Sequence, residues 1–193
     1  INVGTYAAFI AIMAVGMTGI IVMGGIDLSV GSIYGLAAVG GAWTLHWLQI
    51  AHPGLPWQVT VPIGVLLCCV VGGVCGLING LGTVGLAVHP FIITLGGMAV
   101  YRGVAFLISK GQTIGGLPPS YLDSIKVNAL GVNPVPTLVM LVVGVVGAFV
   151  AARTIFGRHT FAIGGNETAA RYAGIAVGRV KVALFAIMGT LAG

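Results

Sequence analysis

Residues 153–181 read RTIFGRHTFAIGGNETAARYAGIAVGRVK and decide how the rest of the chain is arranged. The stretch holds most of the Lys and Arg residues of the chain but only one acid, Glu167, and it lies between two apolar runs. An excess of Lys and Arg keeps a short loop on the cytoplasmic side of a membrane. We therefore expect a cytoplasmic loop here, and the other loops alternate from it: 24–30 and 83–89 inside, 51–59 and 110–134 outside.

The composition is that of a polytopic membrane protein. Of the 193 residues, 58% are hydrophobic and only 6% are charged, and the mean hydropathy is +1.13. Long continuous apolar runs predict helices rather than the alternating strands of a barrel. We expect an all-α transmembrane helical bundle, one partial domain over residues 1–193, with about six spans at 5–23, 31–50, 60–82, 90–109, 135–152 and 180–193. The last run is shorter than the roughly 20 residues of a full span, so we expect the central portion of a longer protein.

The same composition argues against several function classes. The net charge of +5 comes from basic residues that flank apolar runs, so the expected partner is the lipid bilayer and not nucleic acid. The sequence has no Gly-x-x-x-x-Gly-Lys-Ser/Thr phosphate loop, and its His and Cys residues lack metal-site spacing. We therefore expect neither an enzyme nor a cofactor or metal held by this chain.

The first candidate site is the segment GGIDLSVGS at residues 24–32. Two glycines end one helix, and Asp27 or Ser29 can cap the next helix by accepting a free backbone N–H. On that interpretation the segment is a tight turn. The alternative is a break within the membrane, where free N–H groups and the hydroxyls of Ser29 and Ser32 meet a polar solute at a path or gate.

A second candidate is Arg102, well inside the apolar run 90–109. A cation at that depth is unfavourable by several kcal/mol unless it pairs, snorkels to the interface or faces water. Asp27 is the one acid near an apolar run. We therefore expect an Asp27–Arg102 pair at the path or gate, with snorkelling of Arg102 as the alternative.

Glycines recur every four residues at Gly72, Gly76 and Gly80. This spacing places them on one face of a helix, where the backbone of a second helix can approach closely. Asn79 lies beside that face and can donate a hydrogen bond across it. We interpret the pattern as helix packing.

Residues 164–174 carry the signals of a short surface helix. Asn166 is a good N-cap, Glu167 suits the positive end of the helix dipole, Arg171 suits the later turn, and Gly174 suits the C-terminal stop. A helix of about two turns is not stable alone, so we expect it to rest on another part of the molecule. The plainer interpretation is an ordinary amphipathic connector.

Three motifs carry a resemblance to a known family: GGIDLSVGS (24–32), PFIITLGGM (90–98) followed by Arg102-Gly103, and FGR (156–158) followed by AIGGNETAARYAGI (162–175). In this order they resemble the permease subunits of bacterial monosaccharide ABC importers, the ribose, xylose, galactose and arabinose group. The similarity covers nearly the whole chain. It departs mildly at Tyr172-Ala173, where a Leu/Phe-Ser pair is more usual.

The resemblance implies a multi-pass protein of the bacterial plasma (inner) membrane that pairs with a second permease copy as a homodimer. It also implies a periplasmic sugar-binding protein and ABC ATP-binding subunits, which hold the ATP and Mg. In such importers a short cytoplasmic helix of the permease fits a groove on the ATPase. By this match the coupling loop is 153–179, and the coupling residues are Gly164, Gly165, Asn166, Glu167, Ala169, Ala170, Arg171 and Gly174.

Two other functions remain open from the sequence. One is a motor-independent channel or ion-coupled carrier for a small polar solute. The other is a membrane scaffold that transports nothing, in which Asp27 and Arg102 only pack. Dependence of uptake on ATP separates the importer from the carrier.

Overall fold

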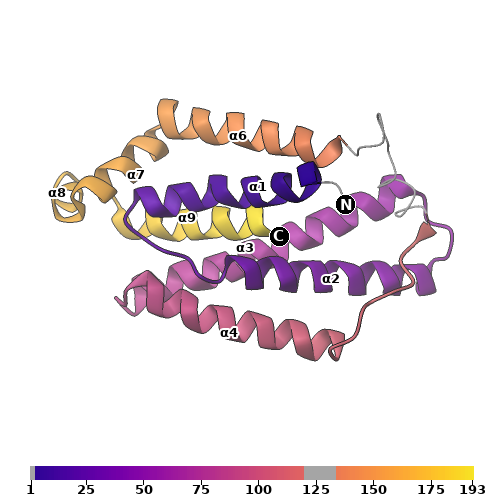
Figure 1. Ribbon diagram of the computed structural model, residues 1–193. Coiled ribbons are helices and arrows are strands. Elements are labelled where there is room, and N and C mark those ends of the chain that lie inside the picture. The colour runs from indigo at the N-terminus through magenta and orange to yellow at the C-terminus, as the bar shows by residue number, and fades with distance from the viewer. Residues whose placement is uncertain (1–2, 120–133) are drawn as a thin grey trace.

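The computed structural model describes residues 3–119 and 134–193 (Figure 1), and the regular elements assigned in these ranges are helices. This confirms the predicted all-α class. The helices lie roughly along one direction as an elongated bundle, apart from a short piece at one end. They are α1 (Val3–Val22), α2 (Val30–Ala51), α3 (Trp57–Gly85), α4 (Pro90–Ser109), α6 (Val135–Arg153), α7 (Ile155–Gly165), α8 (Glu167–Tyr172) and α9 (Val177–Ala192).

The long helices match the predicted spans within a few residues. Among the described residues, α1, α3, α4 and α6 are each long and apolar enough to cross a membrane. Helix α2 has 22 residues but is not among these candidate spans, and α9 has 16 residues. The predicted loop 110–134 falls partly on residues 120–133, which lie outside the described ranges.

The connections of the described residues lie at two ends of the bundle, except for the α1–α2 segment, which runs from the end of α1 into the bundle (Figure 1). At one end the turn between α3 and α4 lines the same pocket as α8 and the start of α9. Gly164 of α7 contacts the backbone of Val22 at the end of α1. We call this end, which carries residues 153–181, the basic end. The opposite end holds the α2–α3 connection and the segment after α4, where Gly116 lies against His46.

Among the described residues the most extensive helix contact is between α3 and α9, and glycines allow the two backbones to approach. A Cβ on Gly76 would overlap the carbonyl oxygen of Phe185, and a Cβ on Gly72 would overlap that of Gly189. Gly80 lies against the backbone of Val182 in the same way. Thus the three glycines singled out in the sequence lie along the face of α3 that meets α9, and the two backbones touch with almost no side chains between them.

Helix α7 is a feature that the sequence analysis missed, since it lies within the expected loop 153–179. Thr154 separates it from α6: the Thr154 hydroxyl accepts a hydrogen bond from the Gly157 N–H (3.1 Å) and donates one to the Val150 carbonyl (2.6 Å). Gly157 fits closely against the carbonyl oxygens of Val150 and Ala151. The N-cap residue Thr154 was the available signal.

Candidate functional site

The short helix α8 lies at the tip of the basic end, where the sequence placed a surface helix. The Asn166 side chain caps it by accepting a hydrogen bond from the Ala169 N–H at 2.9 Å. Gly174 ends it with a left-handed backbone (φ +83°), which a residue without a Cβ adopts readily. Helix α8 covers only Glu167–Tyr172 of the predicted segment 164–174. Gly164 and Gly165 belong to α7 instead.

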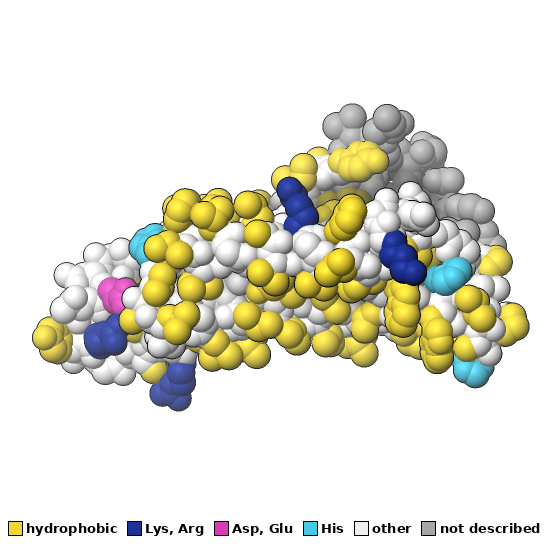
Figure 2. Space-filling view, turned by 90° about the horizontal axis from the view of Figure 1, so that it is seen from below, with side chains coloured by type: hydrophobic (Ala, Val, Ile, Leu, Met, Phe, Trp, Pro, Cys, Tyr) yellow, Lys and Arg dark blue, Asp and Glu magenta, His cyan; other side chains and the backbone are white. Residues whose placement is uncertain are grey.

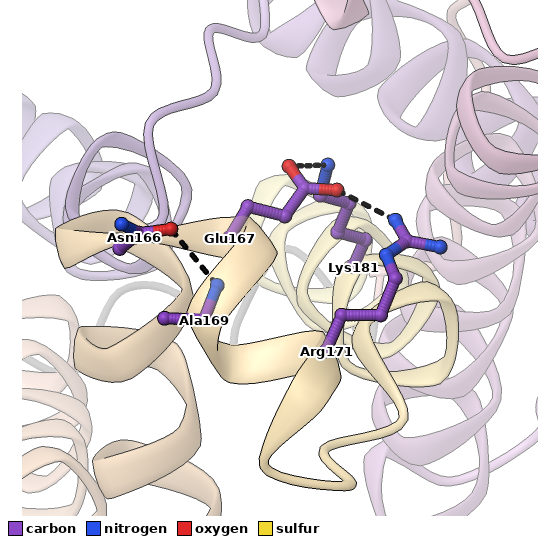
Figure 3. A network of polar contacts seen from close by, with 5 residues as sticks. All are labelled: Asn166, Glu167, Ala169, Arg171 and Lys181. Carbon is purple, nitrogen blue, oxygen red and sulfur yellow. Dashed lines mark hydrogen bonds and ion pairs between the residues drawn. The ribbon is translucent and has the colours of Figure 1, made fainter.

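Glu167 holds α8 onto α9. Its carboxylate accepts a hydrogen bond from Arg171 of the same helix and another from Lys181 of α9, both at 2.8 Å (Figure 3). The pKa of Glu167 lies below its ordinary value, first because Lys181 donates to the carboxylate; partial burial opposes this shift and Arg171 adds to it. We call these three residues, Glu167, Arg171 and Lys181, the Glu167 clasp.

The residues of the segment differ in exposure. Ala170 is buried against the core, and Gly164 is exposed but touches the end of α1. The other exposed residues are Gly165, Asn166, Thr168, Ala169, Arg171, Tyr172, Ala173 and Gly174, of which Tyr172 is 89% exposed. Figure 2 shows charged side chains of both signs at this end; hydrophobic side chains cover much of the rest of the face in view, with some Lys, Arg and His side chains among them. The result is a small exposed helix that is fixed from beneath and free on its outer face.

The second candidate segment, between α1 and α2, is extended and enters the bundle. Its residues alternate between inside and outside, so Asp27 and Ser29 are 3% and 0% exposed. Ser29 is hydrogen-bonded to Asn79, which precedes the end of α3 by about 9 Å along the helix axis. Thr94 of α4 accepts from the Leu28 N–H (3.2 Å) and approaches the Ile26 carbonyl (3.4 Å). Non-helical backbone at this depth needs such side-chain partners, so the segment is a break inside the bundle and not a surface turn.

A chain of buried hydrogen bonds runs from this segment through α3 to α4. Asp27 accepts from the N–H (2.8 Å) and hydroxyl (2.6 Å) of Ser29, and Ser29 accepts from the Asn79 amide (2.8 Å). The Tyr101 hydroxyl lies 2.9 Å from Asn79 Oδ1, to which it donates. We call Asp27, Ser29, Asn79 and Tyr101 the buried polar chain. It joins the start of α2 to two neighbouring helices.

The expected Asp27–Arg102 ion pair is wrong. Asp27 is buried and its Oδ1 accepts two hydrogen bonds from Ser29, whereas Arg102 is exposed on α4 and makes no ion pair with it. No partner of Asp27 Oδ2 lies within the described residues. Tyr101, one residue earlier on α4, is the side chain that turns inward. Ser32 is also buried (4% exposed), and no hydrogen-bond partner of its hydroxyl lies within the described residues. Of the four residues predicted at the path or gate, three are buried and one is on the surface of the chain.

Two residues of this site were missed in the sequence. Thr94 and Tyr101 are, with Pro90, the buried positions of α4, and the two lie two turns apart on one face. In a run that is apolar on all sides, hydropathy does not reveal the inner face. The only available signal was that they are polar residues in such a run.

Comparison with known proteins gives a consistent result. The family described as permease components of branched-chain amino acid transport systems matches residues 1–193. The autoinducer 2 import system permease proteins LsrC and LsrD of Enterobacter sp. (strain 638) are 35% and 36% identical over 94% and 93% of this chain. The inner membrane ABC transporter permease protein YjfF of Escherichia coli (strain K12) is 38% identical over the whole chain.

The alignments cover 50%, 54% and 57% of those three relatives, so the chain spans about half their length. No solved structure matches it. The apolar helices, together with the relative named as an inner membrane permease, confirm the predicted multi-pass location in a bacterial inner membrane.

Proposed function

Because the chain belongs to the family of branched-chain amino acid transport permease components, we propose that it forms membrane spans of an ATP-driven importer and takes its energy from a separate ATP-binding subunit that docks on α8. The observation that supports this proposal most directly is the structure of α8. It is an exposed, capped and ion-paired helix at the basic end of an otherwise apolar bundle. The sequence holds no phosphate loop, so ATP and Mg bind to the partner subunit in this proposal.

The contacts provide a route from α8 to the spans. Displacement of α8 pulls on Lys181 of α9 through Glu167. Helix α9 touches α3 backbone to backbone at Gly72 and Gly76, so α3 follows it. Asn79 of α3 is bonded to Ser29 and Tyr101, which passes the movement to α2 and α4. ATP binding and hydrolysis thereby switch the path between its outward and inward openings.

The solute in this proposal is a neutral polar molecule of the monosaccharide class, delivered by a periplasmic sugar-binding protein. In its support, the names of two relatives refer to autoinducer 2 import. The buried polar groups of the described residues, apart from Asp27, are hydroxyls and an amide, which suit an uncharged solute. Asp27, Ser29 and Ser32 then act by positioning the helices around the path.

A second permease subunit completes the path. Helix α4 exposes Arg102 within an apolar span, and a cation there is unfavourable against lipid. A second permease or a water-filled path at that face removes the penalty. LsrC and LsrD are two differently named permease proteins of one import system in one strain, so the second subunit is either an identical copy or a homologue.

The test is to place Arg171→Glu and Gly174→Trp in the importer, with Arg158→Glu on α7 as a control of equal charge change. We expect the first two to abolish solute-stimulated ATP hydrolysis and uptake while the permease remains folded in the membrane. Arg158→Glu should retain most activity. Normal assembly with the ATPase and normal uptake in both α8 variants would overturn the docking assignment.

A second candidate function is an ion-coupled carrier, which the buried carboxylate of Asp27 favours, since such carriers use intramembrane acids. Uptake into proteoliposomes decides between the two. Uptake that persists without the ATP-binding subunit and follows an ion gradient supports the carrier. Uptake that requires ATP and its subunit supports the importer.

A further inference from the structure

A pocket of about 440 Å³ opens at the basic end between the α3–α4 turn and α8–α9. Its polar lining comes from both sides of the opening. Thr83 and His89 lie at the end of α3 and the start of α4, and the Glu167 clasp lies opposite. Figure 3 shows the three side chains of the clasp converging in front of α9. The pocket therefore adjoins the helix that we assign to ATPase docking.

The charges around the pocket are unbalanced. Two cations, Arg171 and Lys181, share the single carboxylate of Glu167. Each uses one N–H on that carboxylate, while a guanidinium has five and an ammonium three. Among the residues that line the pocket there is no second acid. One further carboxylate would balance the charge and find unused donors.

The uncharged polar groups of the lining are also donors. His89 Nδ1 accepts a hydrogen bond from the Phe91 N–H (3.3 Å), so the neutral ring carries its proton on Nε2. The Thr83 hydroxyl, on a residue that is 5% exposed, has no hydrogen-bond partner among the described residues. A buried hydroxyl without a partner is destabilising, and an acceptor in the pocket relieves it.

We propose that this pocket receives a carboxylate side chain of the ATP-binding subunit, as a second docking point beside α8. The inference rests on the proposed function. The net positive charge of the lining favours an Asp or Glu side chain. Because the pocket lies next to α8, that side chain belongs to the ATP-binding subunit that docks on α8. The surroundings support a protein contact, since Leu86 and Tyr172, which adjoin the lining residues Ala87 and Arg171 in the chain, are 68% and 89% exposed. The partner then contacts the α3–α4 turn and α8 at the same time.

Ala87 offers a matched test, because it lines the pocket and its side chain is exposed. Ala87→Glu supplies the missing carboxylate from the permease itself, and Ala87→Gln has the same size and the same backbone demand (φ +52°) without the charge. We expect Ala87→Glu to raise the measured Kd of the ATP-binding subunit by about tenfold or more, and Ala87→Gln to leave this Kd within about twofold of its original value. Equal effects of the two variants would overturn the proposal.

A second measurement identifies the occupant. Each acid on the docking face of the ATP-binding subunit is replaced by Ala, and its effect on the Kd is measured with the unaltered permease and with Ala87→Glu. One acid should lose its effect when the permease carries Ala87→Glu; if none does, the proposal is overturned. It is overturned equally if inorganic phosphate, or anionic lipid in nanodiscs, slows amide hydrogen exchange of α8 in the permease without the ATPase and does not do so in Ala87→Glu.

The outcome separates the two proposals. If Gly174→Trp prevents assembly with the ATPase while Ala87→Glu and Ala87→Gln change the Kd equally, docking on α8 stands and the pocket proposal fails. If neither Gly174→Trp nor Ala87→Glu changes assembly, both proposals fail.

Discussion

Lys181 Nζ lies 2.8 Å from Glu167 Oε2, and this contact joins α8 to the first long helix that follows it. The Lys181 side chain is 19% exposed, while the Arg171 side chain on the other oxygen is 67% exposed. The inner of the two cations is thus the one that links the helices. Because α8 has only six residues and is not stable alone, this contact decides whether α8 and α9 move together.

Replacing Lys181 by Met should uncouple ATP hydrolysis from uptake with little loss of stability. Partly exposed ion pairs contribute about 0.2–1 kcal/mol, so the thermal unfolding midpoint should barely move. The ratio of ATP hydrolysed to solute imported should nevertheless rise several-fold, because α9 no longer follows α8. Arg179→Met removes the same charge from an exposed position two residues away and should keep the normal ratio. An unchanged ratio in Lys181→Met would exclude this role of the clasp.

The clasp should respond to acid in a defined direction. The pKa of Glu167 is lower in the folded protein than its ordinary value of 4.5, so its contribution is complete above about pH 5 and is lost as the pH falls through the folded pKa, below 4.5. The protection of the α8 amides against hydrogen exchange, corrected for the intrinsic pH dependence of the exchange rate, should therefore fall in that acidic range. Glu167→Gln should remove the transition, and its persistence there would mean that another group causes it.

Enlarging Gly76 should separate α3 from α9. In Gly76→Ala the new methyl group overlaps the Phe185 carbonyl oxygen, and overpacking of this kind is destabilising by about 1–3 kcal/mol. Gly144→Ala in α6 is the control, because nothing lies within 4 Å of its added Cβ. There Ala should be neutral or stabilising by about 0.5–1 kcal/mol. Thermal unfolding in detergent measures both, and equal stability of the two variants would contradict the close approach.

Breaking the buried polar chain should be destabilising in a non-additive way. Asn79→Ala removes the amide that donates to Ser29 and accepts from Tyr101, at about 1–3 kcal/mol, and Tyr101→Phe removes the hydroxyl that bonds Asn79, at about 1 kcal/mol. The double variant should be less destabilised than the sum, because each single change already removes the Asn79–Tyr101 hydrogen bond. Thr18→Val is the control, since its exposed hydroxyl bonds only within its own helix. Strict additivity would argue against the chain.

Most of the fold could be predicted from hydropathy and charge. The spans were found because apolar runs of membrane length have no other stable arrangement, and the caps of α8 because Asn166 and Gly174 act on the backbone next to them. The pairing of Asp27 could not be found by counting charges. One of its oxygens accepts from a hydroxyl two residues away, while the direction of Arg102 depended on the phase of α4.

The Glu167–Lys181 contact was also beyond the sequence analysis. The two residues are fourteen apart and belong to different helices, so only the turn at Gly174 and the start of α9 bring them together. Glu167 was identified from the helix dipole alone. The pocket beside it depends on how the α3–α4 turn packs, which no local signal specifies.

The glycine contact between α3 and α9 limits how these helices can be deformed. Between ordinary helices, long side chains change rotamer and absorb small shifts, but at Gly72, Gly76 and Gly189 there is almost nothing to rearrange. Helices in lipid associate through short-range dispersion, and a gap of about 0.5–1 Å already loses a quarter to a half of it. The pair therefore has no intermediate spacing of low energy: it either moves as one rigid unit or comes apart.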